Sequence, residues 1–290
     1  MEAYGDFASV YDIFMEDTPY AQWADFAVQV IEKYGISRPV RGEERMRDAP
    51  QASGPETEQE VSQASGPETE REALRSERDL VVELGCGTGT LTELLYARGY
   101  DMIGIDSSPE MLGIAMEKRR ESKSGILYLC QDMRELDLYS TAGTVISLCD
   151  SINYLLEDQD ILDTFRLVNN FLYPGGLFFF DFNTVYKYGT VIGDTTIAEN
   201  REDCSFIWEN FYHDKERINE YDLTVFVRTK QERETFRRFC ETHYQRGYTL
   251  DEMSGFVERA GMKLLASVDA DTHGTPDECS ERIYMICRKE

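Results

Sequence analysis

The spacing of hydrophobic residues divides the chain into a central part and two flanks. In the central part, short apolar runs typical of strands alternate with segments whose apolar residues recur every three or four positions, as on one face of a helix. The predicted strands are residues 80–84, 102–106, 126–130, 144–149 and 177–182, and the predicted helices are residues 90–98, 109–120 and 159–172. This alternation predicts an α/β fold, in which a doubly wound parallel sheet carries helices on both faces.

The two flanks follow other patterns. Residues 20–34 place apolar side chains at steps of three and four, which predicts an amphipathic helix, and we expect residues 1–40 to form cap helices. Later in the chain, aromatic and charged residues predict antiparallel strands at residues 206–212, 220–227 and 235–248. We therefore expect residues 186–248, named the roof below, to cover a site on the sheet as an antiparallel β insertion.

The end of the chain returns to the pattern of the central part. A helix is predicted at residues 250–260, and two strands are predicted at residues 263–268 and 282–287. The predicted core therefore consists of residues 80–185 and 249–290.

Residues 41–79 have a composition unlike the rest of the chain. They contain no aromatic residue, and the octet at residues 51–58 recurs at residues 63–70, a period of 12 residues. Two copies of a polar unit that contains Pro and Gly bury too little apolar surface to offset the entropy of the chain, and solenoids need more repeats with an apolar face. We interpret this segment as a disordered insertion.

Net charge limits the partners of this protein. The 290 residues include 30 Lys and Arg against 55 Asp and Glu, which gives a formal net charge of −25 at pH 7. A chain this acidic repels nucleic acid and anionic lipid, because binding to them depends on clustered Lys and Arg. No apolar run approaches the roughly 20 residues of a membrane helix, and the start lacks the basic and apolar regions of a secretion signal. We therefore expect a cytoplasmic protein that binds a small molecule, with no membrane or nucleic-acid partner.

The seven cysteines are scattered along the chain. None of them shows the spacing of zinc ligands, and their number is odd. We expect reduced thiols and no metal site.

A predicted strand that runs into a glycine-rich turn is the strongest local signal of chemistry. Residues 81–89 read VVELGCGTG, which places Gly85, Gly87 and Gly89 between a strand and a helix. Glycine lets a ligand approach the backbone where a Cβ atom would collide with it. The spacing differs from the G-x-G-x-x-G of dinucleotide sites and from a phosphate loop that ends in Lys-Ser/Thr. Glu83 beside the turn suits a ligand with positive charge better than a pyrophosphate. A tight turn without a ligand is the alternative.

Two more carboxylates follow the ends of the next two strands. Asp106 comes 21 residues after Gly85, where a carboxylate can accept hydrogen bonds from both ribose hydroxyls of a nucleoside. Asp132 follows the third strand and is placed to accept a hydrogen bond from an adenine amino group. Open α/β sheets bind ligands at this carboxyl edge. The alternatives are a cap for the helix that follows, in the case of Asp106, and a surface carboxylate, in the case of Asp132.

In this order, and with the turn spelled ELGCGTG, these residues resemble the class I S-adenosylmethionine-dependent methyltransferases, which have a Rossmann-like sheet. Within that class the chain looks most like uncharacterised bacterial small-molecule methyltransferases and, more distantly, like sugar N-methyltransferases with a β roof. The resemblance implies that the glycines line the methionine portion of the cofactor, with Glu83 at its ammonium, Asp106 at the ribose and Asp132 at the adenine. The implied cofactor contacts are Glu83, Gly85, Cys86, Gly87, Gly89, Asp106, Ser107, Asp132, Met133 and Asp150.

The resemblance also implies methyl transfer from S-adenosylmethionine to a nitrogen or oxygen of a small acceptor, by in-line displacement. His243 is the first choice of base because its ordinary pKa lies nearest neutrality, and Glu241, Tyr244 and Asp150 are the other candidates. Tyr11 is expected to close over the cofactor. Each residue also has a structural alternative: His243 as a polar residue on a strand, and Tyr11 as part of a core stripe.

Two other classes of function stay open at this point. An RNA or protein methyltransferase would need a basic or extended groove, which the near-balanced charge of the roof does not favour. A nucleotide-binding oxidoreductase is disfavoured by the glycine spacing.

If the insertion is disordered, deletion of residues 43–77 will leave the melting temperature and the affinity for S-adenosylmethionine nearly unchanged, because no packed surface is lost. Thermal unfolding and calorimetric titration of the shortened protein test this. A large fall in melting temperature would mean that the repeat is packed against the core.

Overall fold

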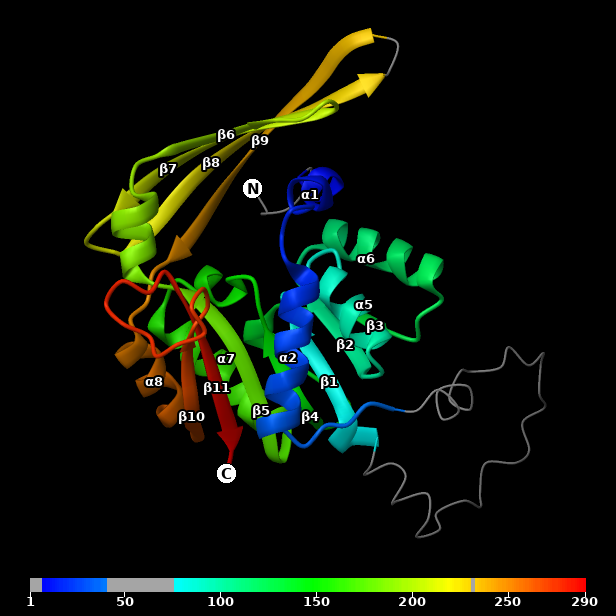
Figure 1. The fold of residues 1–290 in the computed structure, drawn as a ribbon, viewed down its shortest axis with the longest axis vertical. Coiled ribbons are helices and arrows are strands. Elements are labelled where there is room, and N and C mark those ends of the chain that lie inside the picture. Colours follow the sequence, from blue (N-terminus) through cyan, green and yellow to red (C-terminus); the bar gives the residue numbers. More distant parts are fainter. Residues whose placement is uncertain (1–6, 41–75, 231–232) are drawn as a thin grey trace, which may run out of the picture.

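Figure 1 shows the computed structural model, which describes residues 7–40, 76–230 and 233–290. The tandem repeat and its predicted disorder lie outside these residues. Residues 76–79, which the sequence assigned to the insertion, form a helical turn instead. In this turn, Glu77 Oε2 accepts a hydrogen bond of 2.7 Å from Thr141 Oγ1. The described part of the core therefore includes residues 76–79.

The core is built on a seven-stranded sheet in the order β10-β11-β5-β4-β1-β2-β3. Its strands are β1 (Leu80–Leu84), β2 (Asp101–Asp106), β3 (Leu127–Cys130), β4 (Ala142–Ser147), β5 (Leu172–Asn183), β10 (Met262–Asp269) and β11 (Arg282–Lys289). Strands β1 to β5 run parallel, whereas β11 runs antiparallel to both β5 and β10. The predicted doubly wound α/β fold is confirmed. The sequence pattern did not predict the antiparallel direction of β11, which arises because no crossover helix joins β10 to β11.

Helices cover both faces of this sheet. They are α2 (Tyr20–Tyr34), α5 (Thr90–Ala97) and α6 (Pro109–Ser122) on one face and α7 (Asp158–Phe171) and α8 (Leu250–Arg259) on the other. Successive side chains of β1 alternate between them: Val81 packs in the cluster of Leu95, whereas Val82 packs in the cluster of Phe165. Because both faces are buried, the parallel strands read as continuous apolar runs. Within the described residues, no helix is both long and apolar enough to cross a membrane.

The roof is a separate antiparallel sheet in the order β6-β7-β8-β9, and it lies above the carboxyl edge of the core (Figure 1). Its strands are β6 (Thr196–Asn200), β7 (Cys204–His213), β8 (Ile218–Lys230) and β9 (Arg233–Arg246), and the π-helix η3 (Lys187–Ile192) connects it to β5. The predicted antiparallel insertion is thus confirmed. The sequence pattern does not predict β6, because its side chains are mostly exposed and lack an apolar alternation.

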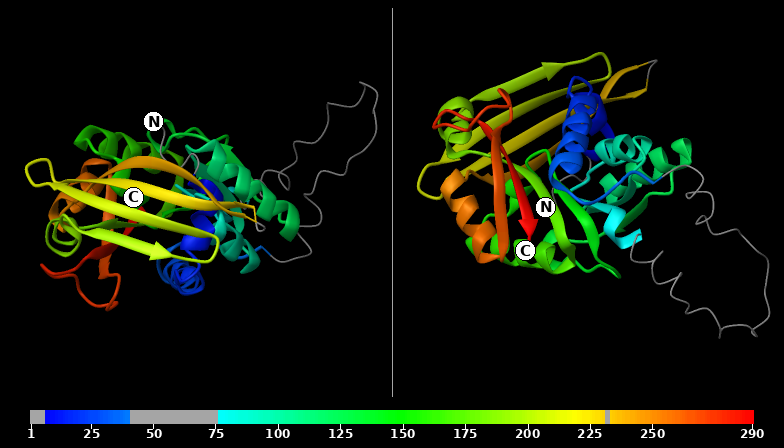
Figure 2. Two further views of the ribbon diagram at one scale, coloured as in Figure 1. Left: turned by 90° about the horizontal axis from the view of Figure 1, so that it is seen from above. Right: turned by 60° about the horizontal axis from the view of Figure 1, so that its bottom comes forward.

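Helix α1 (Ala8–Phe14) lies between the roof and the core (Figures 1 and 2). On the roof side, Val10 packs with Phe206 and Val225. On the core side, the Asp12 carboxylate accepts a 2.6 Å hydrogen bond from Thr88 Oγ1 and forms a 2.7 Å ion pair with Lys118 Nζ. Thr88 belongs to the glycine turn, so α1 connects the roof directly to the predicted ligand site.

Candidate active site

A cavity of about 440 Å³ opens at the carboxyl ends of β1, β2, β3 and β4. This is the edge where a doubly wound sheet binds its ligands. Of the residues predicted to contact the cofactor or act in catalysis, the ones that line the cavity are Tyr11, Glu83, Gly85, Cys86, Gly87, Asp106, Ser107, Asp132 and Met133. The ones that do not line it are Gly89, Asp150 and His243.

The glycines of the turn serve different purposes. Gly87 lines the cavity with φ +53°, and a Cβ atom there would meet no protein atom within 4 Å, so this position leaves open space for a ligand. Gly89 has φ +74° and precedes α5 as its N-cap, and a Cβ atom there would collide with the Tyr128 hydroxyl. Gly89 does not line the cavity, and its lack of a side chain allows close packing between the turn and β3.

Asp106 fixes the glycine turn to the start of α6. Its Oδ2 accepts a 2.8 Å hydrogen bond from the Gly87 N–H, and its Oδ1 accepts one of 2.9 Å from the Ser108 N–H. A carboxylate offers about four acceptor positions, so capacity for ribose hydroxyls remains. Burial raises the pKa of Asp106 above its usual value. The N-cap of α6 is Ser108, whose hydroxyl accepts from the Met111 N–H, so the capping alternative for Asp106 is wrong.

Glu83 is a buried carboxyl group in the wall of the cavity. Its side chain is 3% exposed, and its Oε2 accepts a 2.5 Å hydrogen bond from Thr92 Oγ1. Burial raises the pKa of Glu83 to about 8, because the carboxylate loses its hydration, and the nearby Asp106 carboxylate acts in the same direction. A bound ammonium group would supply a positive charge that favours the ionised form. The open face at Gly87 and this buried carboxyl together fit a ligand with the adenosyl and amino-acid parts of S-adenosylmethionine.

Comparisons with known proteins agree with this geometry. Residues 81–176 match the family described as a methyltransferase domain. The methyltransferase-family protein YqeM of Bacillus subtilis is 31% identical over 287 residues, which cover 99% of this chain and 97% of YqeM. The chain belongs to the class I S-adenosylmethionine-dependent methyltransferases. It is an enzyme, and S-adenosylmethionine is its cofactor.

Solved structures extend the comparison to the whole methyltransferase. The crystal structure of an S-adenosylmethionine-dependent methyltransferase from Clostridium acetobutylicum matches with a TM-score of 0.76 and 25% identity, over 99% of both chains. CalS10 of Micromonospora echinaspora, described as an amino pentose methyltransferase, matches with a TM-score of 0.58 and 19% identity, over 77% of this chain and 88% of that one. The second likeness concerns the fold alone.

Asp132 of the methyltransferase lines the cavity and is paired with a residue that the sequence did not predict as its partner. Its Oδ2 forms a 2.6 Å ion pair with Arg134 Nη2, and its Oδ1 accepts a 2.9 Å hydrogen bond from the Arg134 N–H. The hydrogen bond from the Arg134 side chain is the main cause that lowers the pKa of Asp132. Because Arg134 also lines the cavity, an adenine at this edge would meet an ion pair.

The N-terminal segment supplies aromatic residues to the cavity wall. Tyr11 lines the cavity as predicted, and Tyr20 of α2 lines it too. Phe7 and Phe14, which lie at helical spacing from Tyr11, pack instead against the hydrophobic cluster of the roof that includes Phe206 and Val225. The stripe is therefore divided: its phenylalanines serve packing, and Tyr11 faces the ligand site. Periodicity alone does not make this distinction.

His243 lies behind the cavity wall on β9. Its side chain is 2% exposed, its Nδ1 lies 3.1 Å from Tyr154 Oη, and its Nε2 lies 3.4 Å from Glu241 Oε2. Tyr154 lines the cavity and also forms a 2.7 Å hydrogen bond with Tyr221 Oη of β8. The cavity wall thus contains Tyr154, and His243 lies behind it. The sequence did not single out Tyr154, whose only signal is its place after the fourth strand.

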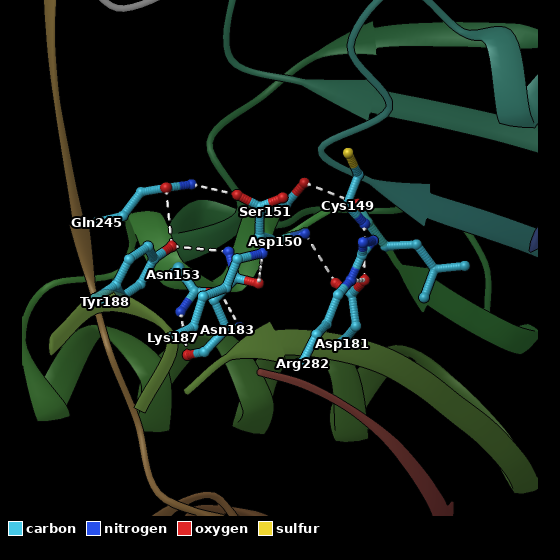
Figure 3. Close-up of polar contacts among 11 residues, drawn as sticks. Cys149, Asp150, Ser151, Asn153, Asp181, Asn183, Lys187, Tyr188, Gln245 and Arg282 are labelled. Atoms are coloured by element: carbon cyan, nitrogen blue, oxygen red, sulfur yellow. Dashed lines mark hydrogen bonds and ion pairs between the residues drawn. The ribbon is translucent and has the colours of Figure 1, made fainter. Parts of the chain in front are cut away.

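Asp150 is not among the residues that line the cofactor cavity, and its carboxylate is directed toward Gln245 of the roof (Figure 3). Its Oδ2 accepts a 2.6 Å hydrogen bond from Gln245 Nε2 of β9. Asp150 and the preceding Cys149 have φ values of +53° and +65°, a region that residues other than glycine rarely adopt. The predicted contact of Asp150 with the cofactor therefore has no counterpart in the lining of the cavity.

Removal of the Asp106 carboxylate tests the cofactor site. We expect Asp106→Ala to weaken S-adenosylmethionine by at least about 1.5 kcal/mol, because hydrogen bonds to a charged group are lost. Isothermal titration measures the affinity, and Asp137→Ala, which removes an exposed carboxylate nearby in the chain, is the matched control. Equal affinities of the two variants would refute the assignment of Asp106.

The raised pKa of Glu83 predicts how stability depends on pH. The folded protein keeps the Glu83 proton up to about pH 8, whereas the unfolded chain loses it near the ordinary value of 4.5. The free energy of unfolding therefore loses about 3 kcal/mol from this group between roughly pH 5.5 and 8.5. Glu83→Gln should abolish that part of the pH dependence in urea unfolding of the ligand-free protein. The exposed Glu135→Gln is the control, and a slope with pH that is the same in both variants would contradict the prediction.

Proposed function

We propose that this methyltransferase methylates a nitrogen or oxygen atom of a small polar molecule that binds between the cofactor cavity and the roof. The observation that carries the proposal is the position of Tyr154, which lines the cavity and is hydrogen-bonded to Tyr221 and His243 of the roof. The roof thereby supports the wall beside the cofactor through Tyr154, although the roof side chains that the structure describes do not themselves line the cavity. An insertion that only stabilised the fold would have no need of polar side chains bonded to a residue of that wall.

His243 is proposed as the proton acceptor that acts through Tyr154. When Nε2 carries the proton and is directed at Glu241, Nδ1 can accept a hydrogen bond from the Tyr154 hydroxyl. Tyr154 can then accept a proton from the substrate as it passes its own to His243. Glu241 also accepts a 2.9 Å hydrogen bond from the Phe7 N–H, so the same carboxylate orients His243 and the start of α1. Tyr11 is proposed to close over the bound cofactor.

S-adenosylmethionine supplies a methyl group activated by a sulfonium. The protein contributes alignment and the exclusion of water, which the roof and α1 provide from above the sheet. The acidity of the chain, −25 overall, supports a small acceptor and disfavours RNA. CalS10, an amino pentose methyltransferase of similar fold, supports the same class of acceptor.

Transfer of a labelled methyl group into fractions of a bacterial lysate tests this proposal. The enzyme is incubated with S-adenosylmethionine tritiated in its methyl group and with the small-molecule filtrate, the RNA or the protein of a Bacillus subtilis strain that lacks YqeM. We expect label in the filtrate. Label that enters only the RNA or the protein would overturn the proposed acceptor class.

The same assay tests His243. We expect His243→Asn to reduce transfer at least about 100-fold, the lower end of what a general base contributes, without a change in the affinity for S-adenosylhomocysteine, because His243 does not line the cavity. His213→Asn is the control, since His213 is an exposed histidine on the roof. Transfer at the wild-type rate in His243→Asn would remove His243 from the mechanism.

A further inference from the structure

A chain of hydrogen bonds with a fixed direction begins at Lys187. An ammonium group only donates, so the 3.0 Å contact between Lys187 Nζ and Asn183 Oδ1 fixes the orientation of the Asn183 amide. The Nδ2 of that amide then donates to Tyr188 Oη over 2.9 Å. Figure 3 shows these residues side by side at the end of β5 and in η3.

The same direction continues to Asp150. The Tyr188 hydroxyl accepts from Asn183 and donates to Gln245 Oε1 over 2.9 Å, which leaves Gln245 Nε2 to donate to Asp150 Oδ2. Tyr188 and Gln245 are both buried, so water does not compete for these bonds. Every hydrogen in the chain points from the Lys187 cation toward the Asp150 carboxylate, and this arrangement favours the ionised form of Asp150.

A second set of contacts fixes the backbone of Asp150. Asp181 accepts hydrogen bonds from the N–H groups of Cys149 (3.1 Å) and Asp150 (2.8 Å) and forms a 2.7 Å ion pair with Arg282 Nε. These bonds hold two consecutive residues in the left-handed region. Local strain of this kind is maintained where a side chain must be aimed.

The second oxygen of Asp150 is available to a ligand. Oδ2 is used by Gln245, whereas Oδ1 forms no hydrogen bond or ion pair with any residue that the structure describes. The neighbours of Asp150 in the chain, Cys149 and Ser151, line the cofactor cavity. Burial raises the pKa of Asp150, while the charges of Lys187 and Arg282 act in the opposite direction and favour the carboxylate.

We infer that Asp150 Oδ1 binds the amino group of the acceptor, so that the substrate of this enzyme is a small amine. This inference rests on the proposed function, and it chooses between the nitrogen and the oxygen left open there. An amine with a free lone pair donates an N–H to Oδ1 and presents that lone pair to the methyl group.

The charges of the reaction favour an amine at this carboxylate. The nitrogen lone pair forms the new N–C bond, the C–S bond breaks, and its electron pair stays on sulfur. Positive charge thus moves from sulfur to nitrogen. The product ammonium group lies beside the Asp150 carboxylate and donates an N–H hydrogen bond to it. A hydroxyl acceptor must instead lose its proton during the transfer. A carboxylate whose ionised form is favoured by the Lys187 chain is a poor base for an alcohol but a good partner for an ammonium group.

Bisubstrate analogues test the inference without a known acceptor. The probes are analogues of S-adenosylhomocysteine with nitrogen in place of sulfur, carrying either a 2-aminoethyl or a 3-aminopropyl arm, and their matched propyl and butyl counterparts. Isothermal titration of the wild-type protein should show at least one amino arm binding about tenfold more tightly than its alkyl counterpart, the preference expected for a charge-assisted hydrogen bond.

Asp150→Asn should abolish that preference and leave the affinity for S-adenosylhomocysteine unchanged, which also demonstrates a folded cofactor site. Asp158→Asn is the matched control, because Asp158 pairs with Arg246 of the same strand β9 but is 64% exposed. It should keep the preference.

Two results would overturn the inference: no preference for either amino arm in the wild type, or a preference that survives in Asp150→Asn. Failure of the proposed function looks different, since label would then appear in RNA or protein rather than in the small-molecule filtrate.

Discussion

The cofactor side and the roof side of the active site both depend on the buried carboxylate of Asp181. Its side chain is 0% exposed, and it binds the N–H groups of Cys149 and Asp150 together with Arg282 Nε. Two consecutive left-handed residues cost about 1–3 kcal/mol each, and these bonds offset that cost. Cys149 lines the cofactor cavity and Asp150 is bonded to the roof. One carboxylate on β5 therefore determines how the end of β4 serves the cofactor on one side and the roof on the other.

The cofactor side and the roof side are built differently, and hydrogen bonds and ion pairs join them. The glycine turn, Asp106 and Glu83 lie on a sheet that is buried on both faces. The roof reaches this edge through Tyr221, which is bonded to Tyr154, and through Gln245, and α1 bridges the two sides through Asp12. Part of the acidity of the chain lies at the site, because carboxylates surround the place of a cationic cofactor and, by our inference, of a cationic product.

The sequence predicted the parts of this structure that depend on local patterns. The five parallel strands, the glycine turn and Asp106 follow from apolar runs and fixed spacings, and the structure agrees with them within a few residues. Contacts between distant segments are different. Tyr154 and His243 are 89 positions apart, and Phe7 and Glu241 are 234 apart, so no periodicity connects them. The direction of the Asp150 side chain likewise depends on Asp181 and Gln245, which are distant in the sequence. The contact of Asp150 with the roof could therefore not be predicted.

Hydrogen exchange in Asp181→Asn tests the central role of this carboxylate most directly. The asparagine amide puts an N–H donor where the wild-type oxygen accepts, so it cannot satisfy Cys149, Asp150 and Arg282 together. We expect the amides of Cys149 and Asp150 to exchange faster than in the wild type, while the amides of Val81 and Val82 in β1 keep their protection. Wild-type exchange rates at Cys149 and Asp150 would contradict the account.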